Sequence, residues 1–267
     1  MLNNKPVSIN KISLSAAIQF KYFFIILTLF SATWLISNIA AVKLVSIFGI
    51  VLTGGFIIFP LTTMLGAILV EVYGYKNARQ AIWAGFILNL CFVFFINIVN
   101  LVPASPQWKY EEQFKNILIP ETRIIIASLM SFLLSDFANS FLMAKMKIKT
   151  RGKSLIKRII ASNSIAISID IICFMLLAFY GAMPANVLSK LLLAAYFKKF
   201  SCQILLLPII WYLINSLKNA EGFEIYDYDT KFNPFSMDNV YAINSIKQLK
   251  AARIENKLPE NYSVLSN

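Results

Sequence analysis

Long stretches of this chain carry almost no charge. Residues 22–42 form an apolar run without a single charged side chain, and a transmembrane helix needs about 20 mostly apolar residues. Hydrophobic residues make up 58% of the chain and the mean hydropathy is +0.67, which is more apolar surface than a soluble core buries. The sequence therefore predicts an all-α integral membrane protein.

The hydrophobic pattern predicts six transmembrane helices. We place them at residues 22–42, 56–73, 81–102, 122–144, 159–180 and 190–217. They form one transmembrane domain over residues 22–217, preceded by an N-terminal segment (1–21) and followed by a polar C-terminal tail (218–267) with partial order.

Two connections between these helices contain residues that interrupt helices. Residues 44–55 include Gly49, Gly54 and Gly55, which favour a tight or partly re-entrant connection. Pro103 and Pro106 end the third span, and we expect a polar loop after them.

Basic residues are concentrated in the even-numbered connections. The connection after the fourth span carries the most: Lys145, Lys147, Lys149, Arg151, Lys153, Lys157 and Arg158. Cytoplasmic loops of membrane proteins accumulate lysine and arginine. We therefore expect both termini to be cytoplasmic.

Composition argues against several other functions. The net charge of +12 lies in loops and tail, where topology explains it, so we expect no direct nucleic-acid partner. The chain has no histidine, its three cysteines form no C-x-x-C pair, and no P-loop is present. We accordingly expect no enzyme activity, no cofactor and no metal site. Asp136 and Asp170 lack the Gly-x-Gly-Asp context of intramembrane aspartyl proteases.

Four charged residues lie well within predicted spans, away from the span ends: Asp136, Asp170, Lys198 and Lys199. A charge near the bilayer centre costs at least ~2.5 to 3.5 kcal/mol and often marks a substrate or ion route. With about 1.5 Å of rise per residue, Asp170 and Lys198 come to the same depth in consecutive helices. We expect these two to pair, either as a functional site or as a structural ion pair.

The sequence does not decide the role of three other polar residues, Asn139, Glu71 and Arg123. Asn139 follows Asp136 by one turn on nearly the same helix face. Glu71 and Arg123 lie near span ends, where a long side chain can serve as an interfacial anchor that reaches water or can take part in function.

The second span carries the motifs Phe59-Pro60-Leu61-Thr62 and Glu71-Val72-Tyr73-Gly74-Tyr75. These motifs resemble the second span of the queuosine precursor transporter family. Further similarity extends over residues 20–217, with matches in other helices at Asn38, Arg123, Ala127-Ser128, Ser131-Phe132, Asn139-Ser140, Ser162, Asp170 and Lys198. One departure is Ala67, because many relatives have an acidic residue four positions before the glutamate.

The resemblance implies a multi-pass transporter of the bacterial cell (inner) membrane. It would import 7-deazaguanine bases, the cyano or aminomethyl queuosine precursors or queuine, for salvage into tRNA. A nucleobase substrate and the lipid membrane are the expected partners; a homo-oligomer and separate energising subunits both stay open. The alternative is the substrate-capture subunit of an energy-coupling factor transporter. The candidate substrate-binding or coupling residues are Asn38, Phe59, Glu71, Arg123, Ser128, Asp136, Asn139, Ser162, Asp170 and Lys198.

The predicted topology can be tested with reporter fusions. A reporter fused after Gly152 should be cytoplasmic and one fused after Met183 should be external, because basic residues surround only the first site. The opposite result at either position contradicts the predicted orientation.

Overall fold

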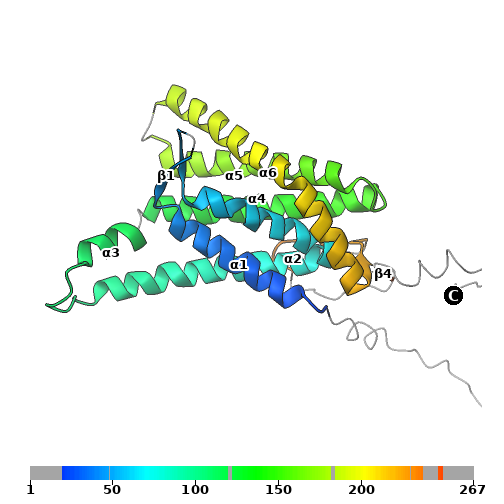
Figure 1. The fold of residues 1–267 in the computed structure, drawn as a ribbon, viewed down its shortest axis with the longest axis horizontal. Helices are drawn as coiled ribbons and strands as arrows, with labels where there is room; N and C mark the ends of the chain where they lie inside the picture. The colour runs from blue at the N-terminus through cyan, green and yellow to red at the C-terminus, as the bar shows by residue number, and fades with distance from the viewer. Residues whose placement is uncertain are drawn as a thin grey trace, which may run out of the picture.

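The computed structural model describes residues 20–47, 49–119, 122–181, 184–228, 230–236 and 246–248. The helices in this part of the chain are α1 (Phe23–Ala40), α2 (Gly55–Leu101), α3 (Glu111–Leu118), α4 (Thr122–Lys149), α5 (Leu155–Phe179) and α6 (Ala185–Glu221). Its strands are β1 (Leu44–Ile47), β2 (Ile50–Thr53), β3 (Phe223–Ile225) and β4 (Ile246–Gln248). The long helices lie side by side, with α3 at one end of the bundle and β4 at the other (Figure 1).

Helix α2 folds back on itself at Gly74. As a straight helix its 47 residues would extend about 70 Å, more than twice the ~30 Å of a bilayer core. Gly74 has φ 79° and ψ 170°, a conformation that is essentially restricted to glycine. The Phe30 ring lies 3.5 Å from the Cβ positions of both Gly66 and Gly85, which would be about 28 Å apart in a straight helix. The two halves therefore run antiparallel (Figure 1), and they correspond to the predicted spans 56–73 and 81–102.

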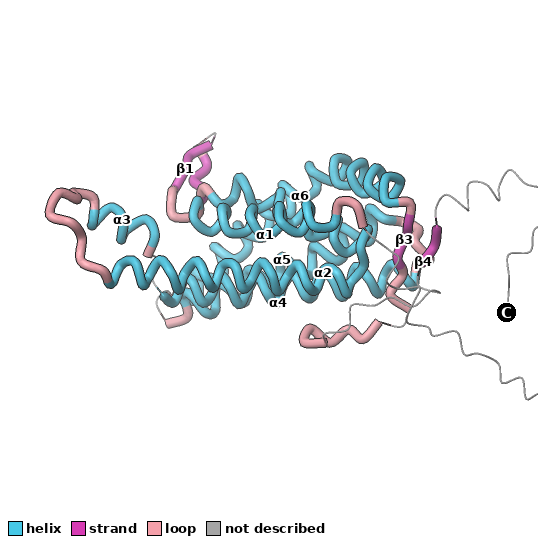
Figure 2. The backbone as a smooth tube through the Cα atoms, turned by 90° about the horizontal axis from the view of Figure 1, so that it is seen from below, coloured by secondary structure: helices cyan, strands magenta, loops and turns pink. Residues whose placement is uncertain are grey.

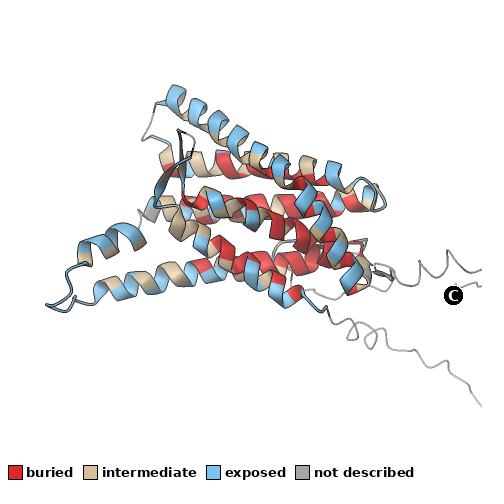
Figure 3. Ribbon diagram, viewed as in Figure 1, coloured by how far each residue is buried: buried red, intermediate tan, exposed pale blue. Residues whose placement is uncertain are grey.

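The helices present apolar side chains to the outside of the bundle. Phe24 is 74% exposed and Leu205 is 76% exposed, whereas Phe30 and Tyr73 are fully buried. Pale outer faces and a red interior show the same arrangement in Figure 3. By length and composition, five helices of the described chain could cross a membrane: α1, α2, α4, α5 and α6. The all-α integral membrane class is thus confirmed, although short strands occur at both ends of the bundle.

The two glycine- and proline-rich connections are more regular than expected. Strands β1 and β2 pair antiparallel, with Leu44 opposite Thr53, and Gly49 between them has φ 79°. After Pro106 the predicted polar loop contains α3, where an ion pair of 3.0 Å joins Lys115 to Glu111. The prediction of a polar loop did not include this helix, which the i, i+4 pair and the two acidic residues in the first turn favour.

A C-terminal strap, residues 223–228 and 230–236, covers the end of the bundle opposite the β1–β2 hairpin (Figure 2). Both carboxylate oxygens of Asp227 accept the backbone N–H of Tyr75, at 3.2 and 3.1 Å, directly after the break at Gly74. Trp83 donates to the carbonyl oxygen of Pro234 at 2.9 Å. Part of the predicted polar tail is therefore packed onto the transmembrane helices.

Replacement of Gly74 by alanine tests the fold-back of α2. Gly74→Ala should lower the stability of the protein by about 1 to 3 kcal/mol. The fold holds position 74 in a backbone conformation that is unfavourable for a residue with a side chain. Gly66→Ala is the matched control, since a Cβ at that helical position makes an ordinary 3.5 Å contact. Thermal unfolding in detergent should separate the two variants, and equal midpoints would contradict this role of Gly74.

Candidate functional site

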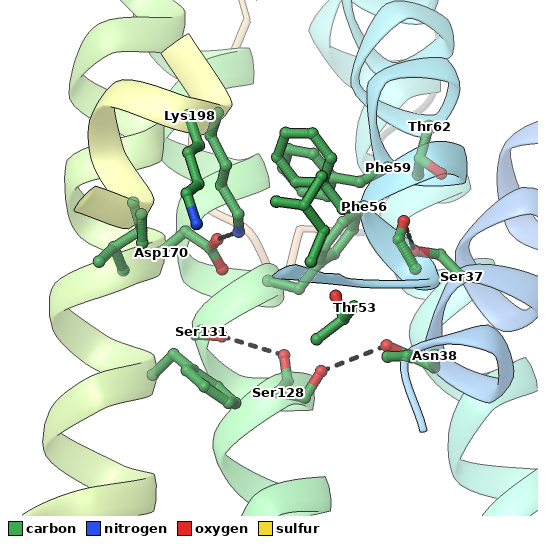
Figure 4. A pocket seen from close by; sticks show the side chains of 18 of the residues that line it. Ser37, Asn38, Thr53, Phe56, Phe59, Thr62, Ser128, Ser131, Asp170 and Lys198 are labelled. Carbon is green, nitrogen blue, oxygen red and sulfur yellow. Dashed lines mark hydrogen bonds and ion pairs between the residues drawn. The ribbon is translucent and has the colours of Figure 1, made fainter. Parts of the chain in front are cut away.

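A cavity of about 400 Å³ lies between the helices in the half of the bundle next to the β1–β2 hairpin (Figure 4). Its walls come from α1, β2, α2, α4, α5 and α6. Ligand sites for small molecules commonly measure about 300 to 1,000 Å³. The cavity is therefore large enough for a small organic molecule.

Aromatic rings form much of the cavity wall. Trp34 of α1 and Phe132 of α4 stack with their ring centroids 3.9 Å apart and an interplanar angle of 21°. Phe56 and Phe59 of α2 and Phe174 of α5 also line the cavity. Such rings offer apolar faces against which a flat heterocycle can pack.

A short hydrogen-bond chain places polar groups in the same cavity. Ser128 Oγ donates to Asn38 Oδ1 at 3.3 Å, and Asn38 Nδ2 donates to Asn89 Oδ1 at 2.7 Å. Asn89 is itself oriented by a bond to the carbonyl oxygen of Gly85. These bonds fix the rotation of the Asn38 amide, which retains a second N–H donor for a ligand.

Asp170 forms an ion pair at the cavity wall. Its Oδ2 lies 2.5 Å from Lys199 Nζ, and that ammonium group also lies 4.2 Å from the centre of the Phe59 ring. The expected partner was Lys198, which lines the same cavity. Depth along a helix predicted the level of the pair correctly, but consecutive residues differ by about 100° around the axis, and this rotation brings Lys199 to Asp170.

Glu71 lies at the centre of a buried ion cluster at the other end of the bundle. Its Oε2 lies 2.6 Å from Arg158 Nη1, and its Oε1 lies 2.6 Å from Lys218 Nζ. Lys147 Nζ donates to the backbone carbonyl of Glu71 at 2.7 Å, and Lys218 also binds Glu224 at 2.7 Å. We call these five side chains the Glu71 ion cluster; they join α2, α4, α5, α6 and β3.

The geometry rules out one of the two interpretations of Glu71. Its side chain is fully buried and carries three cationic partners, so it is not an interfacial anchor that reaches water. Outside the helices, Lys218 and Lys147 hold the pKa of Glu224 below its ordinary value, although burial acts in the opposite direction. The cluster therefore stabilises both carboxylates in their charged form.

The structure brings half of the predicted site residues together. Those that line the cavity are Asn38, Phe59, Ser128, Asp170 and Lys198. The others lie elsewhere: Arg123 donates to the carbonyl oxygens of Leu177 and Tyr180 at the end of α5, and Ser162 donates to Ile159 O. Asp136 and Asn139 are buried in α4 and do not line the cavity, and Glu71 belongs to the ion cluster.

Several residues of both sites were not predicted. Trp34, Ser37 and Thr62 line the cavity, but apolar and hydroxyl residues in a span give no signal of their own. Lys147 and Arg158 were counted only as topology signals in a basic loop. Arg158 is the fourth residue of α5, and its burial depends on the tertiary position of Glu71. Ala67, where many relatives of the resembled family are acidic, is buried among apolar residues.

Comparison with known proteins gives a family match. The family described as "Putative vitamin uptake transporter" matches residues 53–213, more than half of the chain. A relative from Bacillus subtilis (strain 168), named "Probable queuosine precursor transporter", is 25% identical over 186 residues, which cover 69% of this chain and 81% of that protein. No solved structure matches the chain significantly. The resemblance found in the motifs is confirmed.

The Glu71 ion cluster makes a stability prediction. Glu71→Gln leaves three buried cations without their central carboxylate, and breaking a buried ion pair costs about 3 to 5 kcal/mol. Glu111→Gln removes an exposed ion pair in α3, which is worth less than about 1 kcal/mol. Thermal unfolding in detergent should show a large loss only for Glu71→Gln; similar midpoints for the two variants would contradict the role of the cluster.

Proposed function

Because this chain belongs to the vitamin uptake transporter family and is a multi-pass membrane transporter, we propose that it imports 7-deazaguanine bases for queuosine salvage. Its substrates are the cyano and aminomethyl precursors of queuosine, or queuine. The name of the Bacillus subtilis relative supports this substrate class. So do the motifs in α2, α4, α5 and α6 that resemble the queuosine precursor transporter family.

The observation that carries the proposal is the combination of aromatic faces and edge-binding groups in one cavity. Trp34 and Phe132 provide a stacked wall, and Phe59 provides a further ring. Asn38 and Ser128 lie within the same cavity and offer donors and acceptors to the edge of a purine-like base. A base of this kind is flat and carries hydrogen-bonding groups on its edges, so it suits both features.

The proposed topology places six spans in the membrane, with α2 contributing two. The cavity then belongs to the outer half of the protein, and the Glu71 ion cluster and the C-terminal strap close the cytoplasmic side. In this arrangement the base enters from outside. It reaches the cytoplasm when the contacts around Glu71 separate, and Arg123 supports the outer end of α5 through its two carbonyl contacts.

Rescue of tRNA modification tests the substrate. In a bacterium that neither makes nor imports queuosine precursors, expression of this chain should restore queuosine in tRNA when a precursor is supplied. The measurement is the queuosine content of purified tRNA. No rescue by either precursor or by queuine, with the protein detected in the membrane, contradicts the proposal.

Uptake by the purified chain in liposomes separates this function from a substrate-capture subunit. A transporter should carry labelled 7-cyano-7-deazaguanine without other proteins. A capture subunit would bind the base and transport it only when an ATPase partner is added, and that result would replace the proposed mechanism.

The cavity predicts which amide contributes to binding. Asn38→Ala should weaken uptake about tenfold, because loss of one hydrogen bond is worth about 0.5 to 1.5 kcal/mol and the Asn89 and Ser128 contacts are lost with it. Asn97→Ala is the matched control, since that exposed amide bonds only to Val93 of its own helix in the described structure. Equal effects of the two substitutions on the concentration for half-maximal uptake would contradict a binding role for Asn38.

A further inference from the structure

Asp136 of α4 is a buried carboxyl group that lies outside both the cavity lining and the Glu71 ion cluster. Its side chain is 8% exposed, and its Oδ2 forms no hydrogen bond within the described part of the chain. A buried carboxylate without a partner is energetically costly as an anion. Binding of a proton removes this cost.

The register of α4 and α5 brings Asp136 level with Asp170. Ser162 Oγ lies 3.6 Å from Met143 Sδ, which fixes the relative position of these two antiparallel helices. Asp136 precedes Met143 by seven residues, and Asp170 follows Ser162 by eight. The two carboxyl groups therefore differ in height by only about 1.5 Å, and the charge of Asp170 acts on Asp136.

Of the two carboxyl groups at this level, Asp170 is paired with a cation, whereas Asp136 Oδ2 has no hydrogen-bond partner in the described part of the chain. Lys199 binds Asp170, and Lys198 lines the cavity beside it. No charged residue occurs in α1, and those of α2 lie at the end of the Glu71 cluster. Asp170 is the ionisable group that acts on Asp136, and the other ionisable groups near Asp170 in the described chain are Cys173, Lys198 and Lys199.

We propose that Asp136 binds the proton that is imported together with the base, next to the Asp170–Lys199 pair of the cavity. This inference rests on the proposed function and adds its energy source. A proton from outside binds the Asp136 carboxylate while the cavity is open, and the buried carboxyl group then carries no charge. After the Glu71 end opens, the proton leaves to the cytoplasm and the carboxylate is restored, so one proton enters with each base.

The first test compares two kinds of transport by the purified full-length chain in liposomes, with labelled 7-cyano-7-deazaguanine as the probe. Counterflow exchanges base for base without net proton movement, whereas net uptake under an inward proton gradient requires coupling. Asp136→Asn should retain counterflow and lose the acceleration by the gradient. Asp170→Asn should lose both activities, because it removes a group that lines the cavity.

Ser135→Ala is the control for a disturbance of α4. Its hydroxyl bonds only to Phe132 O of its own helix in the described structure, so the variant should keep both counterflow and gradient-driven uptake. Gradient stimulation that persists in Asp136→Asn overturns the proposal. The proposal is also overturned if the wild type shows counterflow but an inward proton gradient does not accelerate its net uptake. That result leaves the proposed function intact.

A second measurement does not depend on the substrate. Infrared spectra of the wild type at neutral pH should contain the carbonyl band of a buried protonated carboxylic acid, and Asp136→Asn should lack it. The same band in both proteins overturns the proposal. Absence of counterflow in the wild type would instead refute the proposed function, and the infrared comparison would still decide whether Asp136 holds a proton.

Discussion

The Glu71 ion cluster is the interaction on which the rest of the bundle depends. One carboxylate without exposure to solvent binds cations from α4, α5 and α6, and these are the helices that the chain must bring together after α2 reverses at Gly74. Removal of any charged partner from such a buried set leaves another charge uncompensated. The cluster therefore fixes which helices meet at this end of the bundle. The cavity lies in the other half, where these ion pairs are not present.

The cavity and the cluster divide the protein into two functional halves. Thr62 at the cavity and Glu71 in the cluster are nine residues apart on α2, a separation of about 14 Å. A movement that separates the charges of the cluster would thus act on the same helix that supplies Phe59 to the cavity. In the proposed transport cycle, α2 connects the binding of the base to the opening of the cytoplasmic side.

The sequence predicted the helices more completely than the sites. Apolar runs gave the positions of the spans, and a glycine-rich stretch gave a tight connection between α1 and α2, because both signals are local. The predicted spans 56–73 and 81–102 also lie on either side of the break at Gly74. The partner of Asp170, in contrast, depends on helix rotation, which spacing does not resolve. Lys147, Arg158 and Lys218 looked like cytoplasmic loop charges; their burial follows only from the packing of four helices around Glu71.

The most direct test of the account is protection of the cavity by its substrate. In a variant with Cys91, Cys173 and Cys202 replaced by alanine, Ser128→Cys should react with a membrane-impermeant thiol reagent added from outside, and 7-cyano-7-deazaguanine should slow that reaction. Ser105→Cys, in the exposed connection before α3, should react at the same rate with and without the base. Equal reaction rates of Ser128→Cys in the presence and absence of saturating base would contradict the assignment of this cavity as the substrate site.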